Sequence, residues 1–316
     1  MQNKYLSYKY FDNILRFDEW QEHSFSTNVY LIFLLFPFAS NISAGYLLLV
    51  WAIIELIWLY SFMINDWYDK EVDRVAGKNK IMYLWSEKKA FSIYLIQITV
   101  GLLFALFLGF QVFIATLIAF LLVHIYSAPP RFKTRGILAP LELSTGYLMS
   151  IIIIVLTFGI YHPLLLPFTA MFVLSVVTDN LRHHIKDHNT DEKTIKTFVT
   201  ESGVQRTEKI LKIVDIIATI SVVSIYAVFS YSLYAAGSRE FATGIILLFI
   251  SWFLFVYFYV SRDIHRDISR TLMNQRFTLL VALIITIYIN QPALYLLLVL
   301  SFMSSKLFLK RALRQE

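Results

Sequence analysis

The chain has 316 residues, of which 58% are hydrophobic and only 16% are charged, and its mean hydropathy is +0.62. The hydrophobic residues form long runs, which excludes an ordinary soluble domain and predicts an all-α membrane protein. The net charge is +6, and the basic residues lie in short loops between these runs. Basic loops orient a chain in the bilayer, so they explain this charge better than nucleic-acid binding does. The chain has no cysteine, which excludes disulfides and thiolate metal sites.

No linker or shift in composition divides the chain into separate domains. Residues 1–25 are polar and aromatic, without the apolar core of a signal peptide, and are expected to form a cytoplasmic or interfacial segment. The hydrophobic segments are 28–40, 43–64, 90–108, 110–126, 137–159, 162–182, 209–232, 241–261, 277–290 and 292–306. A crossing helix needs about 20 residues, so the first and the last two are short, and the last two could form a hairpin or one helix broken at Pro292. The sequence therefore predicts a single domain over residues 1–316, a polytopic helix bundle of about nine, or ten, transmembrane segments.

Lys and Arg residues are concentrated in every second connection. They lie in the loops 65–89, 127–136, 182–209 and 262–276, whereas the intervening turns carry almost none. By the positive-inside rule, the basic loops, the N-terminal segment and the basic C-terminal tail are all expected on the cytoplasmic side.

Two acidic clusters lie at the ends of hydrophobic runs that lead into cytoplasmic loops. The first cluster is Asn65, Asp66, Asp69 and Asp73, and the second is Asp187 and Asp191. On a helix, the three aspartates of the first cluster lie within about 60° of one another. Carboxylates are costly near hydrocarbon, and two such sets could hold Mg²⁺ ions that bridge a diphosphate. Alternatively, the acids could simply neutralise neighbouring lysines in solvated loops.

The spacing of these residues matches a known family. Asn65-x-x-x-Asp69-x-x-x-Asp73, followed by Asp187-x-x-x-Asp191, resembles the paired motifs of the UbiA superfamily of intramembrane prenyltransferases. The segment Y-S-A-P-P-R-F-K at 126–133 resembles that family's loop between the fourth and fifth spans. The motifs occur in the family's order, at the ends of the second, fourth and sixth spans, so the resemblance covers nearly the whole chain.

The resemblance implies both an activity and a set of site residues. The expected activity is transfer of an isoprenyl group from an isoprenyl diphosphate to an aromatic or other lipid-soluble acceptor, within a helical bundle that opens laterally to lipid. Mg²⁺ would be the cofactor, and its implied ligands are Asn65, Asp66, Asp69, Asp73, Asp187 and Asp191. Of these, the implied catalytic residues are Asp69, Asp73, Asp187 and Asp191. The implied substrate contacts are Tyr126, Ser127, Arg131, Lys133, Arg182 and Lys186. The basic side chains would stabilise the departing diphosphate, although each could instead serve only to set the topology.

Three departures from the family pattern concern the acceptor. After the first motif the chain reads K-N-K-I-M-Y-L-W where many relatives have an Arg-Pro pair, and the C-terminal hairpin would be an addition. His183 stands where relatives often have Asn or Asp, and the nearby His184 and His188 could form a zinc pair instead of hydrogen-bonding to the site. Glu55, about 16 Å deeper in its span than Asp66, could line the tail or acceptor cavity or serve only in packing.

Two alternative functions remain open from the sequence. A UbiA-type membrane terpene cyclase would capture the cation within the same molecule and would need no acceptor. A non-catalytic lipid-binding or transport protein is the other alternative. Transporters usually place ionisable residues near the bilayer midplane, however, whereas the acidic clusters of this chain lie at one membrane face.

Overall fold

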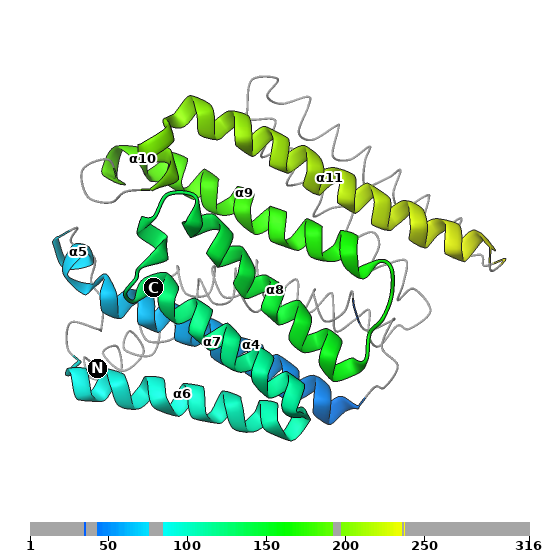
Figure 1. Cartoon of the computed structure of the whole chain (residues 1–316), viewed down its shortest axis with the longest axis horizontal. Coiled ribbons are helices and arrows are strands. Elements are labelled where there is room, and N and C mark those ends of the chain that lie inside the picture. The colour runs from blue at the N-terminus through cyan, green and yellow to red at the C-terminus, as the bar shows by residue number, and fades with distance from the viewer. Residues whose placement is uncertain (1–34, 36–42, 76–84, 192–196, 236, 238–316) are drawn as a thin grey trace, which may run out of the picture. The chain divides into compact units, whose positions relative to one another are not determined.

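The computed structural model describes residues 35, 43–75, 85–191, 197–235 and 237 (Figure 1). These residues form helices and contain no strand, apart from an isolated bridge between Gly136 and Thr197, so the predicted all-α class is confirmed for this part of the chain. The α-helices are α4 (Ala44–Tyr68), α5 (Lys70–Val75), α6 (Glu87–Leu108), α7 (Phe110–Ser127), α8 (Leu138–Phe158), α9 (Leu165–Asp191), α10 (Phe198–Ser202) and α11 (Val204–Ala235), and a 3₁₀ helix, η4, covers Phe132–Thr134.

Five helices in the described part are long and apolar enough to cross a membrane. They are α4 from Gly45, α6, α7, α8 and the Leu165–Ile185 portion of α9, and they coincide with the five segments predicted between 43 and 182. The predicted segment 209–232 lies within α11. Apart from Leu35, the segments 1–25, 28–40, 241–261, 277–290 and 292–306 lie outside the described residues. The membrane class is therefore supported directly, while the total of nine or ten spans stays a prediction.

The described residues fall into two compact units. The first unit contains residues up to 132 together with 149–160, and the second contains 133–148 together with the residues from 161 onward. The helix α8 thus contributes its first half to the second unit and its second half to the first. The single domain expected from the sequence stays a prediction.

In the first unit, α4, α6 and α7 pack against one another (Figure 1). The turn between α6 and α7 is a single residue, Gly109, whose φ of 137° lies in a region that side chains disfavour. Gly101 of α6 allows the Phe120 ring of α7 to approach closely, because a Cβ at this position would lie 2.9 Å from the ring. The Phe120 ring in turn meets the Tyr60 ring edge-on at 5.5 Å. This packing fixes the position of the end of α7 relative to the end of α4.

In the second unit, α9 and α11 lie side by side, and the short α10 packs on both (Figure 1). Their contact contains the buried side chains Val177, Leu181 and Leu211. The helix α10 begins with a capping box, in which the Thr197 hydroxyl accepts a hydrogen bond from the Thr200 N–H and the Thr200 hydroxyl accepts one from the Thr197 N–H. The cap defines where the chain turns back from α9 towards α11.

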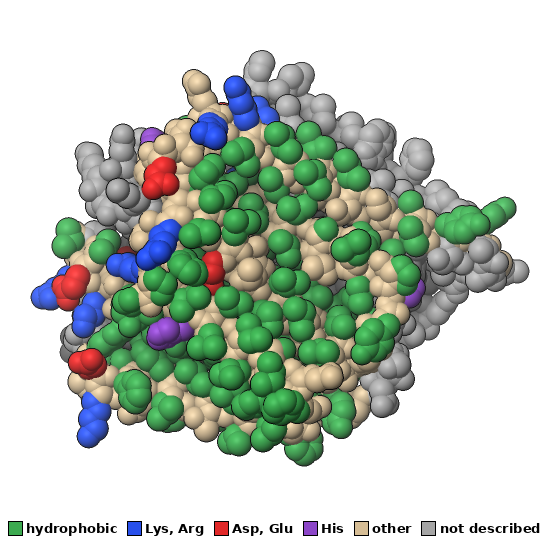
Figure 2. Space-filling view, in the orientation of Figure 1, with side chains coloured by type: hydrophobic (Ala, Val, Ile, Leu, Met, Phe, Trp, Pro, Cys, Tyr) green, Lys and Arg blue, Asp and Glu red, His purple; other side chains and the backbone are tan. Residues whose placement is uncertain are grey.

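The outward-facing surface suits a lipid environment. The helix α6 exposes large apolar side chains along its length, namely Phe91, Leu95, Ile96, Leu103, Leu106 and Phe107. Hydrophobic side chains also predominate on the described surface in Figure 2. Exposed apolar patches of this extent mark a surface that contacts lipid or another partner, which agrees with the membrane-spanning assignment.

Candidate active site

The first acidic cluster follows a nearly uninterrupted helical path. The helix α4 ends at Tyr68 and α5 begins at Lys70, but Asp69 between them keeps helical dihedral angles, with φ −93° and ψ −2°. The Asp69 N–H donates to the Asn65 carbonyl at 2.9 Å, and the Asp73 N–H donates to the Asp69 carbonyl at 2.8 Å. Because this hydrogen bonding continues across the junction, Asn65, Asp69 and Asp73 lie on one face of the path.

The carboxylates of this cluster are poorly exposed to solvent. Asp66 is 4% exposed and Asp73 is 5% exposed, and the Asp69 side chain is 16% exposed. A charged carboxylate is stable at such burial only when positive charge or hydrogen-bond donors compensate for its lost hydration. In their charged form these carboxylates therefore require positive charge or hydrogen-bond donors close by, and Arg131 supplies both for Asp69.

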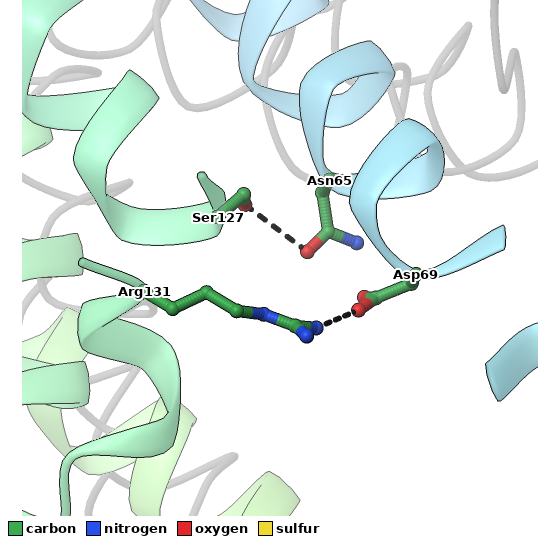
Figure 3. A network of polar contacts seen from close by, with 4 residues as sticks. All are labelled: Asn65, Asp69, Ser127 and Arg131. Atoms are coloured by element: carbon green, nitrogen blue, oxygen red, sulfur yellow. Dashed lines mark hydrogen bonds and ion pairs between the residues drawn. The ribbon is translucent and has the colours of Figure 1, made fainter. Parts of the chain in front are cut away.

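Two polar contacts join this cluster to the end of α7 and the loop after it (Figure 3). The Ser127 hydroxyl donates to Asn65 Oδ1 at 3.2 Å, and Arg131 Nη2 lies 2.5 Å from Asp69 Oδ1. Figure 3 shows both side chains pointing from the α7 side towards α4. The structure thus brings four of the residues singled out in the sequence, Asn65, Asp69, Ser127 and Arg131, into one network.

Arg131 adopts an unusual backbone conformation. Its φ is 62°, in the left-handed region that costs a non-glycine residue about 1–2 kcal/mol. The Arg131 N–H donates to the Ala128 carbonyl at 2.7 Å, which closes the turn after α7. Strain of this kind persists where the surrounding structure enforces it and is common at functional sites.

The donor chemistry of the cluster fits a hard divalent cation. Carboxylate and amide oxygens are the ligands that Mg²⁺ prefers, and the Asp69 carboxylate already holds a cation, the Arg131 guanidinium. Within the described residues, no group of three or more His, Asp or Glu side chains could by itself hold a metal ion. The other predicted ligands, Asp187 and Asp191, lie in the last turns of α9, and their side chains are outside the description. The full metal-ligand set therefore stays a prediction.

The remaining predicted contacts lie in both units. Tyr126 precedes Ser127 in the last turn of α7, and Lys133 lies in η4, which belongs to the second unit from that residue onward. Lys186 lies near the end of α9, with its side chain outside the described part. Arg182 of the same helix forms an ion pair with Asp215 of α11, with Nη2 and Oδ2 2.5 Å apart. The phosphate-contacting role expected for Arg182 stays a prediction.

The histidines considered as a zinc pair and the glutamate considered as a cavity residue lie on two different helices. His183, His184 and His188 lie on α9, and among the described residues they belong to no group of three or more side chains that could hold a metal ion. Glu55 is buried on α4, with 8% of its surface exposed.

Sequence reasoning missed a polar and aromatic cluster beneath the network. The Tyr60 hydroxyl of α4 and His124 Nδ1 of α7 lie 2.6 Å apart, and the Tyr94 hydroxyl of α6 donates to the Met63 carbonyl at 3.2 Å. A histidine within an apolar run was a signal that could have been followed, because ionisable residues inside membranes usually have a specific partner. Its partner, however, is far away in the sequence and is found only from the packing of α4 against α7.

The helices and the acid-bearing end of α4 define a membrane-embedded all-α protein with a candidate cation site. The model of the UbiA prenyltransferase family matches residues 28–280, and the chain belongs to that family. The family recognised from the motifs is therefore confirmed.

Solved structures share this fold at low sequence identity. A UbiA homologue from Archaeoglobus fulgidus bound to DMAPP and Mg²⁺ is 19% identical, covers 86% of this chain and 99% of its own, and has a TM-score of 0.62. The same homologue bound to GPP and Mg²⁺ is 18% identical, covers 87% and 96%, and also has a TM-score of 0.62. A UbiA homologue from Aeropyrum pernix K1 without ligand is 14% identical, covers 83% and 97%, and has a TM-score of 0.55. No curated protein matches the chain.

Proposed function

We propose that this protein is a Mg²⁺-dependent prenyltransferase that moves an isoprenyl group from an isoprenyl diphosphate to an aromatic or other lipid-soluble acceptor. The observation that carries the proposal is the network in which Arg131 holds Asp69 and Ser127 holds Asn65. It joins an acid-rich helix end, which can bind a metal ion, to a basic loop, which can bind a diphosphate, and a metal–diphosphate substrate requires both. Membership of the UbiA prenyltransferase family supports the reaction class. The homologue from Archaeoglobus fulgidus, which has been solved with DMAPP or GPP and Mg²⁺, supports the substrate class.

The proposed metal ligands are the two acidic clusters, Asn65, Asp66, Asp69, Asp73, Asp187 and Asp191. When bound there, Mg²⁺ would offset the negative charge that develops on the leaving diphosphate. The contribution of the chain itself is to keep carboxylates poorly hydrated at the end of α4, so that they bind a cation in preference to water.

The basic side chains are proposed to bind the diphosphate. Arg131, Lys133 and Lys186 would donate hydrogen bonds to phosphate oxygens as the carbon–oxygen bond breaks and the diphosphate leaves with the bonding electrons. The allylic carbon then forms its new bond to the acceptor, which loses a proton. Tyr126 and Ser127 would border the same site. Arg182 is a weaker candidate for a phosphate contact, and its pairing with Asp215 would also position the helix that carries Asp187.

The site is proposed to face the cytoplasm. Both acidic clusters lead into loops rich in Lys and Arg, which the positive-inside rule places on the cytoplasmic side. The diphosphate would therefore bind at the cytoplasmic face, while its isoprenyl tail extends between the helices.

The test uses the purified full chain with Mg²⁺, DMAPP or GPP, and a set of aromatic quinone precursors. We expect a product whose mass equals that of the acceptor plus the isoprenyl group, and no product after the metal is removed by a chelator. A product formed from the diphosphate alone would instead identify a cyclase. A protein that binds neither Mg²⁺ nor diphosphate would contradict both enzymatic assignments.

Paired variants separate the site from its surroundings. Asp69→Asn should lower turnover by roughly a hundredfold or more, because it removes a charged metal ligand while keeping its shape. Glu71→Gln removes an acid two residues away that is 71% exposed, and it should leave turnover unchanged. On α9, Asp187→Asn and the exposed Asp179→Asn form the matching pair. Equal turnover in the Asp69→Asn variant and the unaltered protein would exclude Asp69 as a ligand.

A further inference from the structure

The contact between Arg131 and Asp69 places two groups with different proposed partners against each other. Asp69 is a proposed ligand of Mg²⁺, and Arg131 is a proposed ligand of the diphosphate, yet in the structure they pair with each other at 2.5 Å (Figure 3). Neither ligand can bind fully while this pair is closed. The guanidinium occupies an oxygen that the metal would use, and the carboxylate engages a donor that the phosphate would use.

The two side chains of the pair differ in how far water reaches them. The Arg131 side chain is 33% exposed and the Asp69 side chain is 16% exposed. The guanidinium is therefore the more exposed partner, whereas the poorly exposed carboxylate needs a positive charge beside it, whether Arg131 or another cation supplies that charge. A divalent cation carries twice the charge of the guanidinium in a smaller volume, so it can displace Arg131 from the carboxylate.

The released side chain has a suitable second partner. The planar guanidinium matches a phosphate as well as it matches a carboxylate, since both can accept two parallel hydrogen bonds. The left-handed backbone at Arg131 and the closed turn to Ala128 keep the base of this side chain at the end of α7. The guanidinium therefore has to move only by rotations of its own side chain.

We propose that Arg131 is an exchangeable partner of Asp69 that couples the binding of metal to the binding of diphosphate. In the free protein it holds the Asp69 carboxylate. When Mg²⁺ takes that carboxylate, Arg131 turns to the diphosphate, so each ligand strengthens the binding of the other. The inference rests on the proposed function and adds the order and interdependence of its two ligands.

The test measures binding in the full chain without any turnover. Isothermal titration gives the affinity for Mg²⁺ alone, and then the affinity for inorganic diphosphate at saturating Mg²⁺. In Arg131→Gln, we expect Mg²⁺ alone to bind about tenfold more tightly and diphosphate to bind about tenfold more weakly, within the usual range of coupling between sites. Effects of opposite sign are the signature of exchange, because a merely structural defect would weaken both.

Two further variants complete the design. Arg135→Gln removes the same charge from an exposed position in the same loop, and it should change neither affinity by more than about twofold. Arg131→Lys keeps a charge without the planar fork and should give intermediate effects. Unchanged or weaker Mg²⁺ binding in both Arg131 variants would overturn the exchange, and so would loss of folding in both, because Arg131 would then be a structural residue.

The outcomes also separate this inference from the proposed function. A protein that forms the prenylated product but shows no tighter Mg²⁺ binding in Arg131→Gln keeps its function and loses the exchange. A protein that shows the opposed affinity changes but forms no prenylated product keeps the exchange and loses the transferase assignment. A protein without any Mg²⁺ binding loses both.

Discussion

The guanidinium of Arg182 lies 2.5 Å from the carboxylate of Asp215, and the Asp215 side chain is completely buried. This ion pair joins α9 to α11, five residues before Asp187 on α9. It lies next to the apolar contact made by Leu181 and Leu211, so the two helices are held by both burial and charge.

Asp215→Asn should therefore destabilise the second unit strongly. It leaves the Arg182 charge poorly exposed without its counter-charge, a change that typically costs about 3–5 kcal/mol. The free energy of unfolding in detergent measures the loss. Glu208→Gln, at an exposed position of the same helix, is the control and should stay within about 0.5 kcal/mol of the unaltered protein.

Replacing both partners gives a sharper check of the same pair. Arg182→Met combined with Asp215→Leu removes both charges and should recover much of the stability that the single variant loses. If the loss of unfolding free energy in the double variant equalled the sum of the losses in the two single variants, the two residues would act independently.

Gly101→Ala should destabilise the packing of α6 against α7. The new methyl group would lie 2.9 Å from the Phe120 ring, which is itself packed against Tyr60, so relief requires a shift costing about 1–3 kcal/mol. Thermal unfolding measures the effect. Gly45→Ala is the matched control, because its methyl group would have only ordinary contact with Ser43 at 3.7 Å. A Gly101→Ala variant as stable as the Gly45→Ala variant would contradict this packing.

Tyr60→Phe should lower stability by about 1 kcal/mol, because it removes the hydrogen bond to His124 while keeping the ring contacts with Tyr94 and Phe120. The midpoint of thermal unfolding measures it. The same change at the exposed Tyr46 of α4 should have no measurable effect. Equal midpoints for the two variants would show that the hydrogen bond contributes nothing.

Ser127→Ala should lower the affinity for Mg²⁺ by about tenfold while leaving the fold intact. Its hydroxyl donates to Asn65 Oδ1 at 3.2 Å, and groups that orient a ligand in this way typically contribute 10–100-fold in metal affinity. Calorimetric titration of Mg²⁺ measures the change. Ser144→Ala removes an equally buried hydroxyl that donates to the Leu141 carbonyl of its own helix, and it should not alter the affinity.

The sequence predicted the helices well because apolar runs of spanning length have few alternatives in a membrane. The five segments predicted from 43–64 to 162–182 each coincide with a helix, and the turn expected near residue 109 is the single residue Gly109. The motif spacing was equally informative about Asn65, Asp69 and Asp73, since a repeat of four residues lies on one helix face whatever packs against it.

The contacts between elements could not be predicted in the same way. Arg131 and Ser127 were recognised as site residues, but nothing in the sequence indicated that they would reach Asp69 and Asn65. Tyr60 and His124 were not recognised at all, because their 2.6 Å contact joins residues 64 positions apart. Nor could the sequence show that the partner of Arg182 is Asp215, because the two residues are 33 positions apart and lie on different helices.

The amino-acid sequence by itself determined the membrane class, the positions of the five described spanning helices, the family and the acidic motifs, because all of these depend on local hydrophobicity and on the spacing of residues along the chain. Only the tertiary structure decided which charges meet. The energy of an ion pair or hydrogen bond depends on the distance and burial of two side chains, and both are set by the packing of helices that the chain order alone does not specify.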